Sequence, residues 1–357
     1  MTGLSIAIRI IHLGASLFLV GLFTFLLLVV RAAYQAGKPE GQSALEHFDV
    51  SLLRLAGWSL LVMFLTALLG LWVQLATVTG RPLSRAPAPD VVWSLLTNTQ
   101  YGRIWIIRTA LMTLLGSILW LRDRERDSRD WWALRLEIAA LAVSILVAQA
   151  WTGHAATGEG SALALQVLAD GLHLFASGVW LGSLPALVML LAWVQTADDP
   201  QADLIAAEAT RRFSALALAS VSVLILSGLA NAWELVGTFP ALIGTTYGRL
   251  LLLKVSLLIP LLAIAGLNLG REKPRLLRSI TEPGSSKAQP VIRRLRRNVL
   301  GEVLIGSAIL VLVGALGVTP PAVHEQQSLG RRGCRLHRPV RHGEVVEEFR
   351  PGRGVPR

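Results

Sequence analysis

The chain has 357 residues, of which 53% are hydrophobic and 16% are charged, and its mean hydropathy is +0.55. This composition excludes a disordered chain and argues against an ordinary soluble enzyme, since average soluble domains have roughly 25% charged residues. The single cysteine, Cys334, excludes a disulfide framework and a cysteine-rich metal site. The net charge of +11 lies between long apolar runs, which is typical of a membrane protein. We therefore expect a lipid bilayer around the chain and no nucleic-acid partner.

Eight apolar runs approach the roughly 20 residues needed to cross the hydrocarbon core of a bilayer. In chain order they are Ile10–Val30, Leu55–Thr77, Ile104–Leu121, Trp132–Trp151, Leu168–Val194, Phe213–Trp233, Leu250–Leu269 and Val299–Val318. The first is longer than the apolar region of a signal peptide, which has roughly 7–15 residues, so we expect it to be kept as a spanning helix. The sequence thus predicts an all-α, polytopic membrane bundle of about eight transmembrane helices.

Charges in the loops predict the orientation of these helices. Nine basic residues lie between Arg271 and Arg297, and four arginines lie between Arg122 and Arg129, whereas the segment 152–167 has no Lys or Arg. Because basic loops stay in the cytoplasm, this alternation places both termini on the periplasmic side. The segment 327–357 departs from the rule, since it is basic and we expect it outside. We interpret it as a disordered tail, with a shifted reading frame near Ser328 as the alternative.

Four of the seven histidines fall at the outer ends of four separate helices. His12 is near the start of the first run, His154 follows the fourth, His173 lies in the outer half of the fifth, and His324 follows the eighth. At about 1.5 Å per helical residue, His173 and Met112 each lie roughly one-third of the way into the membrane. Imidazole and thioether together suit soft Cu(I). The pattern therefore indicates a metal path with these five residues as candidate ligands.

Three charged residues are expected inside the membrane, where charge is costly and marks candidate functional sites. Arg108 and Lys254 lie about two turns from the outer ends of their helices. Asp170 is the acidic partner at comparable depth, and it shares a helix face with His173 three residues later. It could orient the imidazole ring or form an ion pair with either cation.

Two other interpretations fit the same histidines. His12 and His173 could ligate haem b axially, as in a membrane redox protein, because two histidines on facing helices suffice for that. The histidines could also be interfacial polar groups of a structural protein without a ligand. The chain contains no Walker loop, no dinucleotide-binding glycine motif after a strand and no H-E-x-x-H motif, so hydrolases and nucleotide-driven pumps lack support. We expect a protein that is not an enzyme.

Several segments, taken in order, resemble the copper resistance protein D (CopD) family. They are Gly153-His-Ala-Ala-Thr-Gly-Glu-Gly160, Leu172-His-Leu-Phe-Ala-Ser-Gly-Val-Trp-Leu-Gly-Ser-Leu-Pro-Ala-Leu187, Arg212-Phe-Ser-Ala-Leu-Ala-Leu218, Ser227-Gly-Leu-Ala-Asn-Ala-Trp233, Tyr247-Gly-Arg-Leu-Leu-Leu-Leu-Lys254 and Pro320-Pro-Ala-Val-His-Glu-Gln326. The resemblance is densest over 150–326 and extends over the whole domain, 1–326.

The resemblance implies a multi-pass bacterial inner-membrane protein that handles copper, moving it from the periplasm toward the cytoplasm. It also implies a separate periplasmic copper carrier of the CopC type as partner. On this interpretation His154 and His324 receive copper, and a deeper site built from His12 and His173, with Met112 as a further candidate ligand, holds it next.

Overall fold

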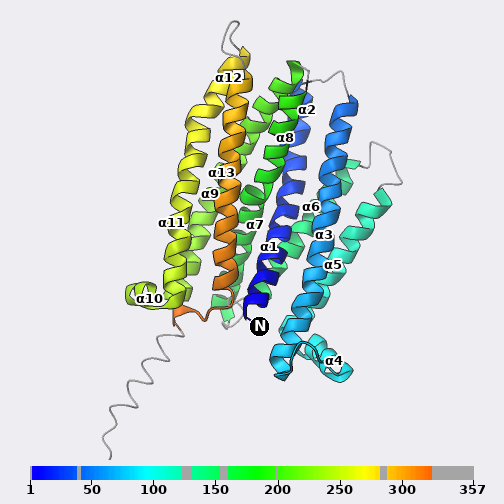
Figure 1. Ribbon diagram of the computed structural model, residues 1–357, viewed down its shortest axis with the longest axis vertical. Coiled ribbons are helices and arrows are strands. Elements are labelled where there is room, and N and C mark those ends of the chain that lie inside the picture. The colour runs from blue at the N-terminus through cyan, green and yellow to red at the C-terminus, as the bar shows by residue number, and fades with distance from the viewer. Residues whose placement is uncertain are drawn as a thin grey trace, which may run out of the picture.

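The computed structural model describes residues 2–37, 42–122, 131–152, 160–197, 200–281 and 288–323. These residues form a bundle of long helices, and no strand occurs among them (Figure 1). The predicted all-α helical bundle is confirmed.

The helices follow the apolar runs of the sequence, with shorter helices between them. The α-helices are α1 (Thr2–Phe25), α2 (Arg31–Gly37), α3 (Gln42–Thr79), α4 (Pro89–Asn98), α5 (Gln100–Arg122), α6 (Trp131–Val147), α7 (Gly160–Trp180), α8 (Leu184–Thr196), α9 (Pro200–Val236), α10 (Phe239–Gly244), α11 (Thr246–Leu267), α12 (Lys273–Thr281) and α13 (Ala288–Leu316). Two π-helical turns, Leu26–Val30 and Asn268–Glu272, and two 3₁₀ turns, Ala148–Thr152 and Leu181–Ser183, continue these helices.

Seven helical segments among the described residues are long and apolar enough to cross a membrane. They are Thr2–Gln35, Phe48–Thr79, Gln100–Leu121, Leu163–Thr196, Gln201–Val236, Thr246–Thr281 and Ala288–Leu316. The fourth expected run, Trp132–Trp151, is also helical throughout, but it consists of α6, which has 17 residues, and the 3₁₀ turn Ala148–Thr152, and it is not among these seven.

Two features shape the fifth expected run. It is a single span, but its helix tightens into the 3₁₀ turn Leu181–Ser183 before α8 begins, with Pro185 in the first turn of α8. Proline has no N–H to donate, so this position is one where a helix tolerates it. At the same level α1 and α7 touch: a Cβ on Gly21 would overlap the backbone of Gly182. Glycine at both positions lets the two backbones meet.

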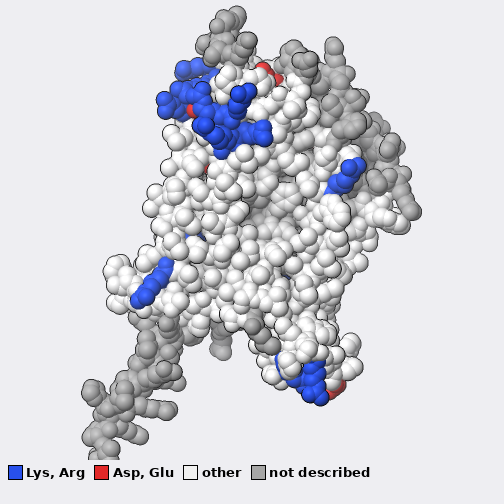
Figure 2. All heavy atoms as spheres, in the orientation of Figure 1, with Lys and Arg blue, Asp and Glu red and all other residues white. Residues whose placement is uncertain are grey.

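The two ends of the bundle differ in charge. The N-terminus, α4, α10 and the end of α13 lie at one end, and α12 lies at the other (Figure 1). Basic side chains gather over α12 and the start of α13 (Figure 2). We call the end where α12 lies the basic end. The opposite end, where the cavity described below opens, is called the cavity end. Exposed members of the cluster include Arg271, Arg275, Arg278, Arg293, Arg294 and Arg297.

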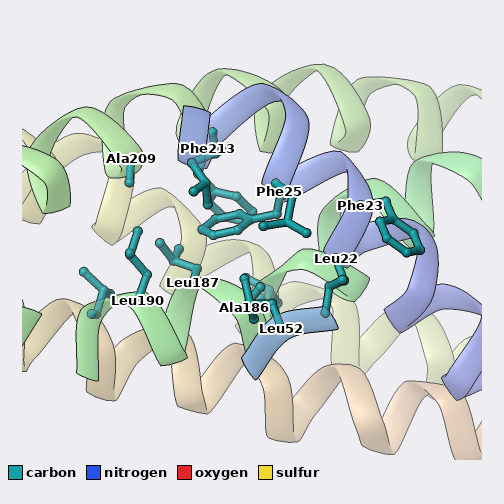
Figure 3. Close-up of a cluster of buried hydrophobic side chains, with 14 of the residues drawn as sticks. Leu22, Phe23, Phe25, Leu52, Ala186, Leu187, Leu190, Ala209 and Phe213 are labelled. Carbon is teal, nitrogen blue, oxygen red and sulfur yellow. The ribbon is translucent and has the colours of Figure 1, made fainter. Parts of the chain in front are cut away.

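The main hydrophobic core lies where α1, α3, α8 and α9 meet (Figure 3). Phe25 and Phe213 pack edge to face with ring centroids 6.4 Å apart, and Leu22, Leu52 and Leu190 are fully buried beside them. The residues labelled in Figure 3 come from the parts of α1, α3, α8 and α9 that lie nearer the basic end. Apolar side chains therefore fill the space between these helices on the side of the basic end.

Candidate functional site

A cavity of about 510 Å³ opens among six long helices toward the cavity end. Its lining comes from α1, α3, α5, α7, α9 and α11, with the end of α13. Six residues singled out from the sequence all line it: His12, Arg108, Met112, Asp170, His173 and Lys254. The helices carrying them are separated widely in the chain, so the bundle brings the set together.

His12 on α1 is buried and fixed by a hydroxyl on α3. Its Nδ1 lies 2.8 Å from Thr66 Oγ1. The Thr66 hydroxyl donates its one proton back along its own helix, to the carbonyl of Val62 at 2.7 Å. Thr66 therefore accepts the bond from His12, and the proton on the ring is at Nδ1. This leaves the lone pair of Nε2 for another partner.

His173 on α7 is held in the same way by α9. Its Nδ1 lies 3.1 Å from Ser227 Oγ, and that hydroxyl donates to the carbonyl of Val223 at 2.6 Å. The ring is again protonated at Nδ1, and the Nε2 lone pair is left over. Both histidines therefore have the tautomer in which a neutral imidazole can bind a metal ion through Nε2.

The cavity is rich in cationic side chains. Arg108 contacts Nε2 of His12 through its guanidinium, so it occupies the lone pair that a metal would use. Arg9 donates to the carbonyl of Gly317 at 2.6 Å, which ties α1 to the end of α13. Lys254 also faces the cavity, from α11. A cation entering this space must therefore displace or shield Arg108 before it reaches His12.

Asp170 interacts electrostatically with Lys254, and it also has a hydrogen-bond partner that the sequence did not single out. Its carboxylate accepts a hydrogen bond from Asn231 Nδ2 at 2.7 Å. Within the described ranges it forms no ion pair within 4.0 Å of Arg108 or Lys254. The ring of His173 is oriented by Ser227 rather than by Asp170, because α9 presents its hydroxyl and its amide to the face that the two residues share.

Met112 on α5 is fully buried, and it lines the cavity together with His12. No group of three His, Cys, Asp or Glu side chains is close enough to hold a metal ion in the part of the chain that the structure describes. The available donors are thus imidazole and thioether, with one carboxylate. This set is typical of soft Cu(I) rather than of oxygen-seeking Mg²⁺ or Ca²⁺.

The two expected entry residues cannot be placed. His154 and His324 lie outside the described residues, as does the segment 327–357. A path from these histidines to the cavity therefore stays a prediction. Before these histidines the described chain reaches Thr152, two residues after the cavity-lining Ala150, and Val323, five residues after the cavity-lining Val318.

The site also contains polar residues that were not predicted from the sequence to lie there. Thr66 and Ser227, which orient the histidines, and Tyr101 and Tyr247, which line the cavity, are the main ones. Hydroxyl residues in apolar helices usually bond to their own helix, so the first two gave no distinct signal. The tyrosines did, because each begins the same tripeptide, Tyr-Gly-Arg, at 101–103 and again at 247–249.

Two family models match consecutive parts of the chain. Residues 1–164 match the model described as copper resistance protein D-like, N-terminal domain, and residues 207–316 match copper resistance protein D. The two matches include α1–α6 and α9–α13, and hence most of the cavity lining.

Curated relatives agree with these matches. The chain is 34% identical to copper transport protein CutJ of Bacillus subtilis over 60% of its length, but the match spans only 39% of CutJ. It is 28% identical to copper resistance protein D of Pseudomonas syringae pv. tomato, covering 72% of this chain and 82% of that one. Inner membrane protein YebZ of Escherichia coli is 26% identical over 64% of this chain and 72% of its own. No solved structure matches.

Proposed function

Since the chain belongs to the copper resistance protein D family, we propose that it moves copper from the periplasm toward the cytoplasm through the histidine-lined cavity. The family and the apolar spans make it a multi-pass protein of the bacterial inner membrane. One relative is named a copper transport protein and another a copper resistance protein, which supports copper as the cargo. This role is transport or homeostasis rather than catalysis.

The observation that carries the proposal is the state of the two cavity histidines. The hydrogen bonds to Thr66 and Ser227 place the ring proton of His12 and of His173 on Nδ1, so each ring has its lone pair at Nε2, which in His12 is contacted by Arg108. A neutral imidazole is the form that binds metal ions, and the hydrogen bond to the hydroxyl group holds each ring in one orientation. Met112 adds a thioether to the lining of the same cavity.

The sidedness of transport follows from the basic end. Lys and Arg gather around α12 and the start of α13 (Figure 2), and the cavity is lined by residues near the other end of the bundle. By the positive-inside rule this end faces the cytoplasm, and the cavity therefore opens to the periplasm with both described ends of the chain. Copper would enter from the periplasmic side, where a separate carrier of the CopC type would deliver it and His154 and His324 would receive it.

Arg108 has a gating role in this proposal. Its guanidinium contacts Nε2 of His12 and competes with the metal for that lone pair. Copper binding at His12 then requires the side chain to turn away, for example toward an anion that enters with the copper. Such a competitor would keep the site closed to weakly bound cations and admit those that bind imidazole strongly.

The test is elemental analysis and a UV–visible spectrum of the full chain in detergent, before and after addition of Cu(I). We expect copper bound without a Soret band, and loss of bound copper in a His12→Ala/His173→Ala double variant. A Soret band that shifts on reduction would instead assign the cavity to haem b with the same two histidines as axial ligands. Equal copper in the wild type and the double variant would refute the assignment of the ligands.

A further inference from the structure

The chain contains an internal repeat, and the first span of its first half corresponds to the first span of its second half. Thr2–Gln35 and Leu163–Thr196 are both 34 residues long and begin 161 residues apart, by subtraction of 2 from 163. The same displacement relates His12 to His173, Ser16 to Ser177, and Gly21 to Gly182. In both spans the serine donates to the carbonyl of the histidine at 2.7 Å.

The second span of each half repeats with the same displacement. It relates Thr66 on α3 to Ser227 on α9, and Trp72 to Trp233. In each case the hydroxyl accepts from the histidine of the preceding span and donates to the carbonyl four residues before it. The pair that fixes the tautomer is thus built twice.

The third span repeats together with its entry. A short helix, α4 or α10, leads to a threonine whose hydroxyl accepts from the N–H three residues later at 3.0 Å, Thr99 from Gly102 and Thr245 from Gly248. A Cβ on Gly102 or on Gly248 would overlap a carbonyl of that short helix. Both turns therefore require glycine, which explains the repeated Tyr-Gly-Arg. Seven residues after each tyrosine a cation lines the cavity, Arg108 or Lys254.

The contact between the halves shows how the copies are arranged. Gly21 and Gly182, which correspond to one another, touch directly, so the axis that relates the halves runs between α1 and α7. Both histidines line the cavity at the same end, so the two spans are parallel and this axis runs along the bundle. Repeats with an axis along the membrane normal are one of the two arrangements known in transporters.

The same contact separates the two histidines. His12 precedes Gly21 by nine residues, as His173 precedes Gly182. Nine residues are about two and a half turns at 3.6 residues per turn, so each histidine lies on the helix face opposite the glycine contact. His12 accordingly points toward α3 and α5, and His173 toward α9. Each ring belongs to its own half.

We propose that the cavity contains two copper sites, one in each half, rather than a single ion shared by His12 and His173. The inference rests on the proposed copper function and adds the number and position of the sites. The histidine–hydroxyl pair is the same in the two halves, but the other residues around each histidine differ. Met112 is replaced by Leu258 in the second half, and Arg9 is replaced by Asp170. The first site is therefore softer than the second.

The test measures Cu(I) stoichiometry on the full chain in detergent, by anaerobic competition with a chromophoric Cu(I) chelator. The variants are His12→Gln, His173→Gln and the double, with helix content and gel filtration as controls of folding. We expect each single variant to lose one equivalent of Cu(I) relative to wild type and the double to lose two. Milder variants, Thr66→Val and Ser227→Ala, should each weaken one of the two binding steps.

The outcomes separate the two proposals. If either single substitution removes as much copper as the double, one ion is shared and the two-site inference is wrong, while the copper function stands. If the double variant binds as much copper as wild type, neither histidine is a ligand and both proposals fail. Loss of one equivalent from each single variant, with the second equivalent retained, is the result that supports two sites.

Discussion

Replacing Thr66 by valine tests how the first histidine is held. Valine keeps the shape of threonine and removes the hydroxyl that accepts from His12 Nδ1 at 2.8 Å. The ring then loses its fixed tautomer and orientation. Loss of such a partner to a metal-binding histidine typically costs about 10–100-fold in affinity. At about 1.4 kcal/mol per tenfold, this corresponds to roughly 1.4–2.8 kcal/mol of binding free energy.

The assay is a Cu(I) titration of Thr66→Val against the wild type, with the dissociation constant of each binding step fitted separately. Thr113→Val on α5 is the matched control, because its hydroxyl also bonds four residues back along its helix but is exposed. We expect the control to bind as wild type. An unchanged affinity in Thr66→Val, with helix content retained, would refute the role of the hydroxyl and with it the tautomer argument for His12.

Two further predictions concern the packing and the donor set. Gly21→Ala places a methyl group on the backbone of Gly182, so we expect it to lower the stability of the protein in detergent by about 1–3 kcal/mol, as at other overpacked positions. Gly57→Ala is the control and should not lower the stability, because nothing lies within 4 Å of a Cβ at that position. Equal melting temperatures of the two variants would contradict the contact between Gly21 and Gly182. Met112→Leu removes the thioether at nearly constant volume and should weaken Cu(I) binding at the His12 site by roughly tenfold, or about 1.4 kcal/mol; the same loss at both sites, or none, would count against Met112 as a ligand.

Hydropathy predicted the long helices and the common end at which His12 and His173 lie, because both depend on local sequence. It missed α4, α10 and α12, since a window of about 20 residues averages over helices of 10, 6 and 9 residues. It predicted the helical run Trp132–Trp151 but not that the run ends in the 3₁₀ turn Ala148–Thr152. Composition of a run says little about where its helix tightens into a 3₁₀ turn.

The partners of the site residues were beyond the sequence for a different reason. Asp170 accepts a hydrogen bond from Asn231, a partner that the sequence did not single out. Which side chain faces which depends on the rotation and order of the helices, and the apolar pattern of a lipid-exposed helix constrains these weakly. The internal repeat was present in the sequence, in the two histidines and the two Tyr-Gly-Arg tripeptides. It becomes convincing only once the hydrogen bonds are seen to repeat as well.

The sealed half of the bundle bears on how cargo could cross it. Phe25, Phe213 and their neighbours close the way from the cavity to the basic end (Figure 3). In transporters with inverted repeats, the halves can exchange conformations and turn an outward-facing shape into an inward-facing one. Halves related by an axis along the membrane normal cannot, because the exchange reproduces the same outward opening. Alternating access in this protein therefore requires the aromatic and leucine packing on the basic side to separate by a movement that symmetry does not supply.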